Sequence, residues 1–247
     1  MPRFFVSPAA LAADTVCLLP EDCRHVALSL RMAVGEEITL SDGEGREALC
    51  RLVAISPERV EAKVLSRAEG RGELPVDVLL YQALPKGDKL ELITQKVVEL
   101  GALAVYPFES SRCITRVRAE RVAKQTERLC RVAQEAAGQC GRSRLPRVGE
   151  PLSFRAALEH ARAHADLVLF CYEAEGERGL RRVLEDAKRD GISRIAVFVG
   201  SEGGFSPEEA AAAVEAGAIS VSLGSRILRC ETAPLFAVSC IAYTYEL

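Results

Sequence analysis

Apolar and polar residues alternate over about the first 70 residues of the chain, which is the pattern of half-buried β-strands. The segment 36–55 (EEITLSDGEGREALCRLVAI) predicts two strands joined by a turn at 42–45, and 56–66 (SPERVEAKVLS) predicts a further turn and strand. Short strands at this spacing indicate a small sheet or barrel. The polar, glycine-containing segment 66–75 (SRAEGRGELP) predicts a linker.

From Val76 onward the pattern changes to apolar runs that alternate with segments of helical periodicity. The apolar runs predict strands at 76–84, 104–108, 166–173, 194–200 and 219–224. The periodic segments predict helices at 89–101, 119–141, 179–191, 206–217 and 233–247. This alternation predicts an α/β domain with a mainly parallel sheet covered on both faces, and ligands of such sheets usually bind beyond the carboxyl ends of the strands.

The composition indicates a globular protein of one or two domains, with 247 residues of which 49% are apolar and 27% charged. Every apolar stretch is shorter than the ~18 residues that a membrane span needs, and the N-terminal segment lacks the apolar core of a signal peptide. We therefore expect a cytoplasmic protein that contacts no membrane.

Cysteine and histidine give no metal-binding pattern. The nine cysteines include no C-x-x-C pair, so most are expected to be small buried side chains. His160 and His164 lie one helical turn apart, but no third ligand accompanies them. We expect no metal site and place both histidines on a solvated helix face.

The segment 198–209 (FVGSEGGFSPEE) joins a predicted strand to a predicted helix and contains three glycines, Gly200, Gly203 and Gly204. Their spacing does not match the dinucleotide fingerprint G-x-G-x-x-G, and no G-K-[ST] follows. Ser206 is the expected N-cap of the helix, and the carboxylates at 208 and 209 disfavour a phosphate there. Glu202 adds negative charge, so a site for a neutral or cationic ligand competes with a plain turn.

A second long connection, 221–234 (VSLGSRILRCETAP), also joins a predicted strand to a predicted helix. Gly224 permits close approach of the main chain, and Leu223, Ile227 and Leu228 can supply an apolar wall. Two such loops predict one pocket suited to a flat aromatic base. Gly203 of the first loop is expected to adopt a positive φ and to lie against the ligand.

The net charge of −3 argues against nucleic-acid binding, but the charge is unevenly distributed. Segment 112–147 holds ten basic and only three acidic residues. Arg121, Lys124, Arg128 and Arg131 recur at helical spacing and form one basic stripe. A solvated helix face is the ordinary explanation of such a stripe, whereas the scarcity of acids favours a surface for an RNA backbone.

The chain resembles the bacterial 16S ribosomal RNA uracil-N3 methyltransferases of the SPOUT class in five ordered motifs: LPKGDK (84–89), QKVVELG (95–101), EAAGQCGRSRLP (135–146), VGSEGGFSPEE (199–209) and LGSRILRCETA (223–233). The segment 25–45 is also similar to the opening domain of that family. The chain departs from the usual motifs at Ser201 and Ser225, where the family often has proline, and at Cys230, where it has threonine. Loss of the two prolines is expected to loosen both loops.

The resemblance implies a PUA-like β-barrel over residues 1–70 that binds RNA, followed by a SPOUT methyltransferase domain over residues 73–247 with a C-terminal trefoil knot. It implies S-adenosylmethionine as the cofactor, no metal, and a homodimer packed partly through the knot helices. The reaction that it implies is methylation of N3 of one uridine in 16S rRNA, within the small ribosomal subunit.

The motifs and loop patterns together give a set of expected site residues. Arg229 is the expected catalytic residue, because its charge could stabilise negative charge that develops on the uracil. Glu202 is a candidate for the base, with Glu231 and water as alternatives. The expected cofactor contacts are Leu84, Gly200, Glu202, Gly203, Gly204, Leu223, Gly224, Ser225, Ile227, Leu228, Cys230 and Thr232. The expected RNA contacts are Arg3, Lys86, Arg121, Lys124, Arg128, Arg131, Arg142 and Arg144.

The sequence leaves three other functions open. A SPOUT methyltransferase could act on another rRNA nucleotide or on tRNA. The barrel and the basic helix could serve a non-catalytic RNA-binding or ribosome-assembly protein. A nucleotide-binding oxidoreductase fits the glycine spacing less well.

Overall fold

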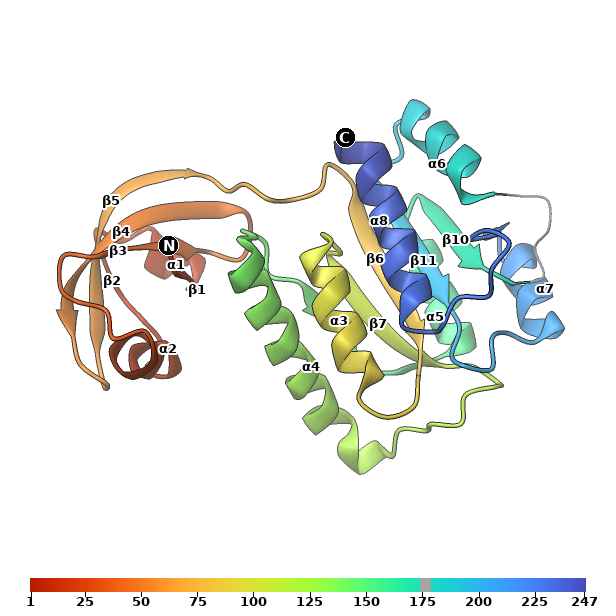
Figure 1. Ribbon diagram of the computed structural model, residues 1–247, viewed down its shortest axis with the longest axis horizontal. Coiled ribbons are helices and arrows are strands. Elements are labelled where there is room, and N and C mark those ends of the chain that lie inside the picture. Colours follow the sequence, from red (N-terminus) through yellow and green to blue (C-terminus); the bar gives the residue numbers. More distant parts are fainter. Residues whose placement is uncertain (174–178) are drawn as a thin grey trace. The chain divides into compact units, whose positions relative to one another are not determined.

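The computed structural model describes residues 1–173 and 179–247, which form two compact units (Figure 1). The first unit comprises Met1–Glu73 and Gln134–Leu145, and the second comprises Leu74–Ala133 and Pro146–Leu247. In both ranges that the structure describes, no helix is long and apolar enough to cross a bilayer.

The first unit is built on a five-stranded sheet with the strand order β1-β3-β4-β5-β2. Its elements are β1 (Arg3–Phe5), α1 (Pro8–Leu11), β2 (Thr15–Cys17), α2 (Pro20–Arg24), η1 (His25–Ser29), β3 (Glu37–Ser41), β4 (Arg46–Ile55) and β5 (Val60–Glu69). Strands β3, β4 and β5 pair antiparallel, and alternate residues such as Ile38 and Leu40 face a buried apolar cluster. The strands predicted in 36–66 are therefore confirmed.

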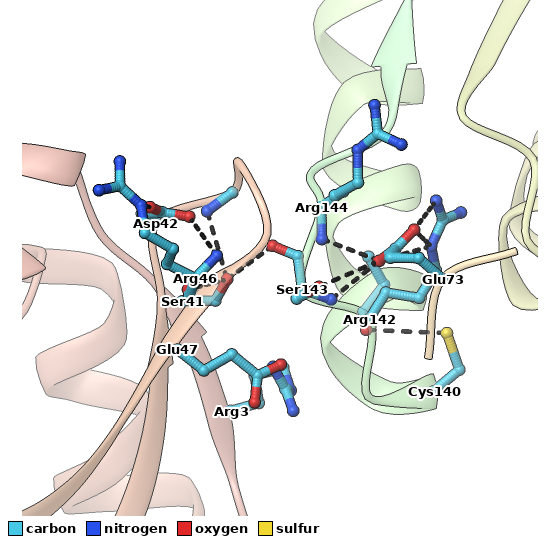
Figure 2. Close-up of polar contacts among 12 residues, drawn as sticks. Arg3, Ser41, Asp42, Arg46, Glu47, Glu73, Cys140, Arg142, Ser143 and Arg144 are labelled. Carbon is cyan, nitrogen blue, oxygen red and sulfur yellow. Dashed lines mark hydrogen bonds and ion pairs between the residues drawn. The ribbon is translucent and has the colours of Figure 1, made fainter. Parts of the chain in front are cut away.

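The predicted linker 66–75 contains the boundary between the two units, at Glu73 and Leu74, but its first residues belong to β5, which continues to Glu69, and Glu73 anchors residues 142–144 (Figure 2). The Glu73 carboxylate accepts hydrogen bonds from the Arg142 guanidinium at 2.7 Å and from the main-chain N–H groups of Ser143 and Arg144, each at 2.9 Å. The Ser41 hydroxyl donates to the Ser143 carbonyl at 2.6 Å. These bonds join segment 134–145 to the N-terminal sheet.

Two of the expected RNA contacts are used inside this unit (Figure 2). The side chain of Arg142 is only 3% exposed and pairs with Glu73. The side chain of Arg3 is 13% exposed and pairs with Glu47. A buried guanidinium that is held by a carboxylate must break that pair before it can meet a phosphate, which leaves an uncompensated buried charge behind. RNA contact by Arg3 and Arg142 stays a prediction, and their burial and pairing argue against it.

The second unit contains a seven-stranded parallel sheet with the order β12-β10-β11-β6-β7-β8, and β9 also pairs with β7. Its strands are β6 (Asp77–Ala83), β7 (Ala104–Glu109), β8 (Arg147–Val148), β9 (Leu152–Ser153), β10 (Leu167–Cys171), β11 (Arg194–Val199) and β12 (Ile219–Val221). The helices that begin in this unit are α3 (Lys89–Glu99), α4 (Ala119–Cys140), α5 (Phe154–His164), α6 (Leu180–Arg189), α7 (Pro207–Glu215) and α8 (Thr232–Glu246).

Both faces of the parallel sheet are buried, as the continuous apolar strands predicted. In β6, Val78 and Leu80 face a cluster that also includes residues of α3, α6 and α8. Leu79 and Tyr81 face the opposite cluster, where Tyr81 stacks on Phe198 with ring centroids 4.6 Å apart. Helices α3 and α8 lie side by side over the first of these faces (Figure 1).

The two units confirm the predicted fold class, a small β-rich domain before an α/β domain with a parallel sheet. Helix α8 follows the long connection 222–231 and packs against β6 and β11. The threading of this connection that a trefoil knot requires stays a prediction of the resemblance.

Candidate functional site

A pocket of about 440 Å³ lies at the carboxyl ends of β10, β11 and β12. This position is the usual ligand site of an open parallel sheet, because the loops that follow neighbouring strands meet there. Three segments line the pocket, and they comprise Cys171–Glu173, Val199–Gly204 and Ser222–Cys230, with Ala233 beside them. The two loops predicted from the sequence to share one pocket therefore do so.

The expected cofactor contacts all line this pocket except Leu84 and Thr232. Leu84 is 2% exposed, belongs to the apolar core, and donates its main-chain N–H to the Phe108 carbonyl. Thr232 is exposed at the start of α8. The sequence missed Cys171, Tyr172 and Glu173, although the end of the predicted strand 166–173 pointed to this segment.

The glycine turn after β11 is shaped by Gly204 rather than by Gly203. Gly204 has a φ of +63°, and a Cβ built on it would overlap the Glu173 carboxylate on the pocket wall. Gly203 has no positive φ, and its Cβ would meet the main chain and side chain of Arg112 at 3.0–3.1 Å. The expectation of a positive φ at Gly203 is therefore wrong, and the conformation of the turn requires glycine at position 204 instead.

Two further contacts fix the turn. The buried Gln82 amide donates to the Gly200 carbonyl at 3.1 Å, which ties the turn to the end of β6. Ser206 and Glu209 form the predicted capping box of α7. These contacts fix the turn at both ends, and the surface of the turn that lines the pocket can contact a ligand.

Ser201 presents an unsatisfied hydroxyl in the pocket wall. The residue is 7% exposed, and its Oγ finds no hydrogen-bond partner within the described part of the chain. A buried hydroxyl without a partner is unfavourable by about 1–3 kcal/mol.

One ammonium group ties three segments together beside the pocket. Lys89 Nζ lies 3.0 Å from Glu202 Oε1 and 3.0 Å from Glu231 Oε2. Glu202 also accepts a hydrogen bond from the main-chain N–H of Lys86 at 3.2 Å. The motif LPKGDK, the glycine turn and the start of α8 therefore meet at Lys89, which the sequence did not single out.

These contacts keep both carboxylates ionised. Partial burial raises the pKa of Glu202, but hydrogen bonds from its own N–H, from Lys89 and from Lys86 outweigh this and bring the pKa to about 2. Hydrogen bonds from Cys230 and Lys89 lower the pKa of Glu231 as well. A carboxylate with so low a pKa accepts a proton poorly at neutral pH. The low pKa of Glu202 therefore argues against this carboxylate as the base, and the identity of the base stays a prediction.

Cys230 takes over the hydrogen bond that a threonine hydroxyl could make at this position. Its thiol lies 3.2 Å from Glu231 Oε2 and 3.7 Å from Lys89 Nζ. Burial, together with the neighbouring carboxylates, raises the pKa of the thiol to about 12, so it stays protonated and donates to Glu231.

Arg229 and Arg226 both line the pocket from the second loop, and both side chains are exposed. The Arg229 carbonyl accepts hydrogen bonds from the N–H groups of Thr232 and Ala233 at 2.8 and 2.9 Å, which fixes the Arg229 main chain at the start of α8. Arg229 therefore combines a fixed main chain with a side chain that borders the cavity.

The predicted basic stripe on α4 is partly neutralised. Arg128 pairs with Glu91 at 2.8 Å, and Arg131 pairs with Glu127 at 3.4 Å. Arg121 and Lys124 are exposed, and the structured residues place no acidic partner beside either of them. The two other expected RNA contacts lie outside the stripe. Lys86 is exposed, and the main-chain N–H of Arg144 donates to the Glu73 carboxylate. The charge of the stripe without an acidic partner is therefore that of Arg121 and Lys124, in the first turns of α4.

Of the two histidines of α5, His164 is exposed as predicted, whereas His160 is partly buried. His160 Nδ1 lies 2.6 Å from the hydroxyl of the buried Tyr81, and its ring stacks on His164 with centroids 4.1 Å apart. Partial burial lowers the pKa of His160. Within residues 1–173 and 179–247, no group of three or more histidine, cysteine or acidic side chains could hold a metal ion.

Comparison with known proteins gives a consistent set of relatives. Residues 72–242 match the model of an RNA methyltransferase domain, and residues 19–65 match the model of an RNA methyltransferase PUA domain. The chain is 36% identical to ribosomal RNA small subunit methyltransferase E of Bacillus subtilis over 95% of its length and 92% of the relative. It is 33% identical to the Mycobacterium bovis protein of that name, over 88% of the chain and 82% of the relative. A solved structure of the Neisseria gonorrhoeae enzyme of the same name, bound to S-adenosyl methionine, aligns with a TM-score of 0.86 and 34% identity over 99% of this chain and 98% of that one.

Proposed function

Because the chain belongs to the ribosomal RNA small subunit methyltransferase E family, we propose that it transfers the methyl group of S-adenosylmethionine to N3 of a uridine in 16S rRNA. The observation that carries this proposal is the pocket formed by the glycine turn and the 222–230 loop at the ends of three neighbouring strands. A solved relative with S-adenosyl methionine bound, aligned over almost the whole chain, supports the same cofactor here.

The residues of the pocket fit this cofactor. S-adenosylmethionine supplies an electrophilic methyl group on a positively charged sulfonium. The volume of about 440 Å³ suits a ligand of this size. Leu223, Ile227 and Leu228 give an apolar wall for the adenine. A phosphate-bearing cofactor would instead meet Glu202 and the carboxylates at the start of α7.

The carboxylate cluster at Lys89 favours a cation, while Arg226 and Arg229 add positive charge to the pocket wall. Glu202 and Glu231 are ionised, and Lys89 neutralises only one of the two charges. The cluster therefore carries a net charge of about −1 next to the glycine turn. Opposite charge at this distance stabilises a sulfonium and does little for a neutral thioether.

The reaction replaces the proton on N3 of uridine by a methyl group, so that an N–C bond forms as a C–S bond breaks. Glu202 and Glu231 stay ionised and paired to Lys89, and the proton passes to water. Arg229 lies on the pocket wall, where its guanidinium stabilises negative charge that develops on the uracil oxygens. Orientation of the uracil by the pocket supplies much of the remaining rate.

Lys89→Met tests the carboxylate cluster. Because the pKa of Glu202 lies below its usual value of 4.5, its charge is present at neutral pH and is lost only as the pH falls toward about 2. A neighbouring opposite charge typically lowers a carboxyl pKa by about 1–3 units. Without Lys89 the two carboxylates repel each other, so affinity for S-adenosylmethionine should begin to fall at a pH at least about one unit higher.

The measurement is calorimetric titration of S-adenosylmethionine between pH 3 and pH 8, with folding checked at each pH by circular dichroism. Lys96→Met is the matched control, because Lys96 pairs with Glu99 away from the pocket. Lys89→Arg should restore most of the wild-type profile. Identical profiles for the wild-type, Lys89→Met and Lys96→Met proteins would remove Lys89 from this role.

The protein acts as a homodimer through the exposed side of α8. From Thr232 to Tyr245 this helix carries no charged residue. Thr232, Phe236, Ser239 and Tyr243 recur at helical spacing on its exposed side, with Phe236 39% and Tyr243 71% exposed. An uncharged stripe of this kind is self-complementary across a twofold axis, which is how most homodimers form.

Replacing Phe236 and Tyr243 by arginine should convert the dimer to a monomer, because two buried like charges would face each other across the twofold axis. Light scattering at micromolar concentration measures the mass. Val214→Arg changes an apolar side chain of α7 that is 54% exposed and serves as the control. A wild-type protein that is monomeric at these concentrations contradicts the dimer.

The experiment that tests the function is mass mapping of rRNA nucleosides in cells with and without the gene. One N3-methyluridine of cytoplasmic small subunits should disappear on deletion. The purified protein with S-adenosylmethionine should restore it in small subunits from the deletion strain. A lost methyl group in tRNA, or at another base, would establish the alternative substrate, and an unchanged nucleoside map would indicate a non-catalytic RNA-binding protein.

A further inference from the structure

A second cavity, of about 280 Å³, lies at the beginning of α4 and shares no residue with the pocket described above. It is lined by Thr115, Arg116, Val117, Arg118, Arg121 and Gln125. Three of these side chains are guanidinium groups, and none of the lining residues is acidic. Such a cavity is suited to an anion with several oxygen atoms.

The acids of the neighbourhood leave most of this charge uncompensated. Glu109 pairs with Arg116 at 3.1 Å and also accepts the main-chain N–H of Val117 at 3.0 Å, so it fixes the wall of the cavity. Among the residues with described structure, no carboxylate pairs with Arg118 or Arg121. The Gln125 side chain, with two N–H donors, also has no hydrogen-bond partner there.

Short contacts connect the wall of this cavity to the proposed cofactor pocket. Arg112 donates to the Gly203 carbonyl at 3.2 Å, and the Ser111 N–H donates to Glu209 at 2.7 Å. The Thr115 hydroxyl donates to the Pro85 carbonyl at 3.0 Å, next to Lys86, whose N–H binds Glu202. The segment 110–117 therefore borders the glycine turn at one end and the arginine cavity at the other.

We propose that this cavity binds a backbone phosphate of the substrate RNA close to the nucleotide that is methylated. The inference rests on the proposed function, because an rRNA methyltransferase must bind its substrate RNA beside the cofactor pocket. Arg118 and Arg121 bind the phosphate oxygens, Arg116 is held ready by Glu109, and Gln125 donates to a phosphate or ribose oxygen. The cavity is larger than one phosphate group, so it also admits part of the attached ribose.

The phosphate fixes the register of the RNA strand and leaves the choice of base to the other pocket. This assignment also moves the RNA contact toward the start of α4, away from Arg128 and Arg131, which have acidic partners.

The test uses the double variant Arg118→Gln/Arg121→Gln of the full-length protein. Its matched control, Arg162→Gln/Arg182→Gln, removes the same charge from exposed positions on α5 and α6. Binding of small subunits from a deletion strain, and single-turnover methylation of them, are measured between 50 and 300 mM salt. Affinity for S-adenosylmethionine is measured separately.

The cavity variant should bind the subunit about tenfold more weakly at low salt, and the slope of log affinity against log salt should decrease by about 0.7–0.9 for the lost phosphate contact. Methyl transfer at subsaturating subunit should fall in proportion to the loss of binding, whereas affinity for S-adenosylmethionine should stay within about twofold of the wild type, because the cavity shares no residue with the cofactor pocket. The control variant should resemble the wild type.

Equal affinities and equal salt slopes for the two variants would overturn the phosphate site, even if the wild-type protein methylates the subunit normally. A wild-type protein that binds the subunit in a cavity-dependent way but transfers no methyl group would refute the proposed function and keep the site. Inorganic phosphate should bind only in the millimolar range. Micromolar binding of inorganic phosphate that the cavity variant abolishes would point to a small phosphate compound and overturn the RNA assignment.

Discussion

Gly204→Val should lower the affinity for S-adenosylmethionine roughly 100-fold while the chain stays folded. Gly204 has a φ of +63°, which a β-branched residue adopts only with strain. Its new side chain would also overlap the Glu173 carboxylate, which lines the pocket. The Glu173 side chain can rotate away, but the backbone strain is relieved only if the glycine turn moves, and the turn provides one wall of the cavity.

A matched control separates damage to the pocket from backbone strain alone. Gly217, at the other end of α7, also has a positive φ, of +88°, but a Cβ there meets nothing within 4 Å. Gly217→Val should therefore destabilise the fold without a comparable effect on cofactor affinity. Calorimetry gives the affinity, and circular dichroism confirms folding. A folded Gly204→Val protein with wild-type affinity would show that the turn does not contact the cofactor.

Local patterns in the sequence predicted the elements around the pocket well. The capping box at Ser206 and the strand that ends at Val199 depend on residues a few positions apart, so the sequence alone defines them. The pocket position followed from a general property of parallel sheets, that loops after neighbouring strands lie together. The family resemblance added the identity of the ligand, S-adenosylmethionine.

Contacts between distant segments were not predictable in the same way. Lys89 meets Glu202 and Glu231 only because three loops converge, and a lysine in a polar loop has no local signal for that role. The sequence suggested that Arg142 belongs to a basic surface. In the structure its guanidinium pairs inside the first unit with Glu73, 69 residues earlier in the chain. Charge counted along the chain cannot distinguish a guanidinium that is exposed from one that is paired and buried.

The departures from the family motifs are accommodated by the pocket in different ways. Cys230 keeps a hydrogen-bond donor to Glu231, so the carboxylate cluster survives the loss of a hydroxyl. Ser201 adds a buried polar atom that is satisfied only when a ligand or water reaches it. The proline that the family often has there would need no such partner.

Arg229→Ala should reduce the rate of methyl transfer by about 10²–10³-fold, the usual loss when a group that stabilises developing charge is removed. Affinity for S-adenosylmethionine should fall much less, because the adenosine is held by loop main chain and by the apolar wall at Leu223, Ile227 and Leu228. Single-turnover transfer to small subunits that lack the modification measures the rate, with the affinity determined separately.

The matched control is Arg226→Ala, which removes the same charge from the same loop and the same pocket wall. Arg229 differs from it because its carbonyl is bonded to the first turn of α8, so its main chain is fixed while the guanidinium borders the cavity. If the two variants lose equal activity, the effect belongs to the overall charge of the loop. Equal losses in rate and cofactor affinity for Arg229→Ala would make it a residue that positions the cofactor. A large loss in rate alone, restored in part by Arg229→Lys, is the outcome expected when the positive charge acts on the uracil in the transition state.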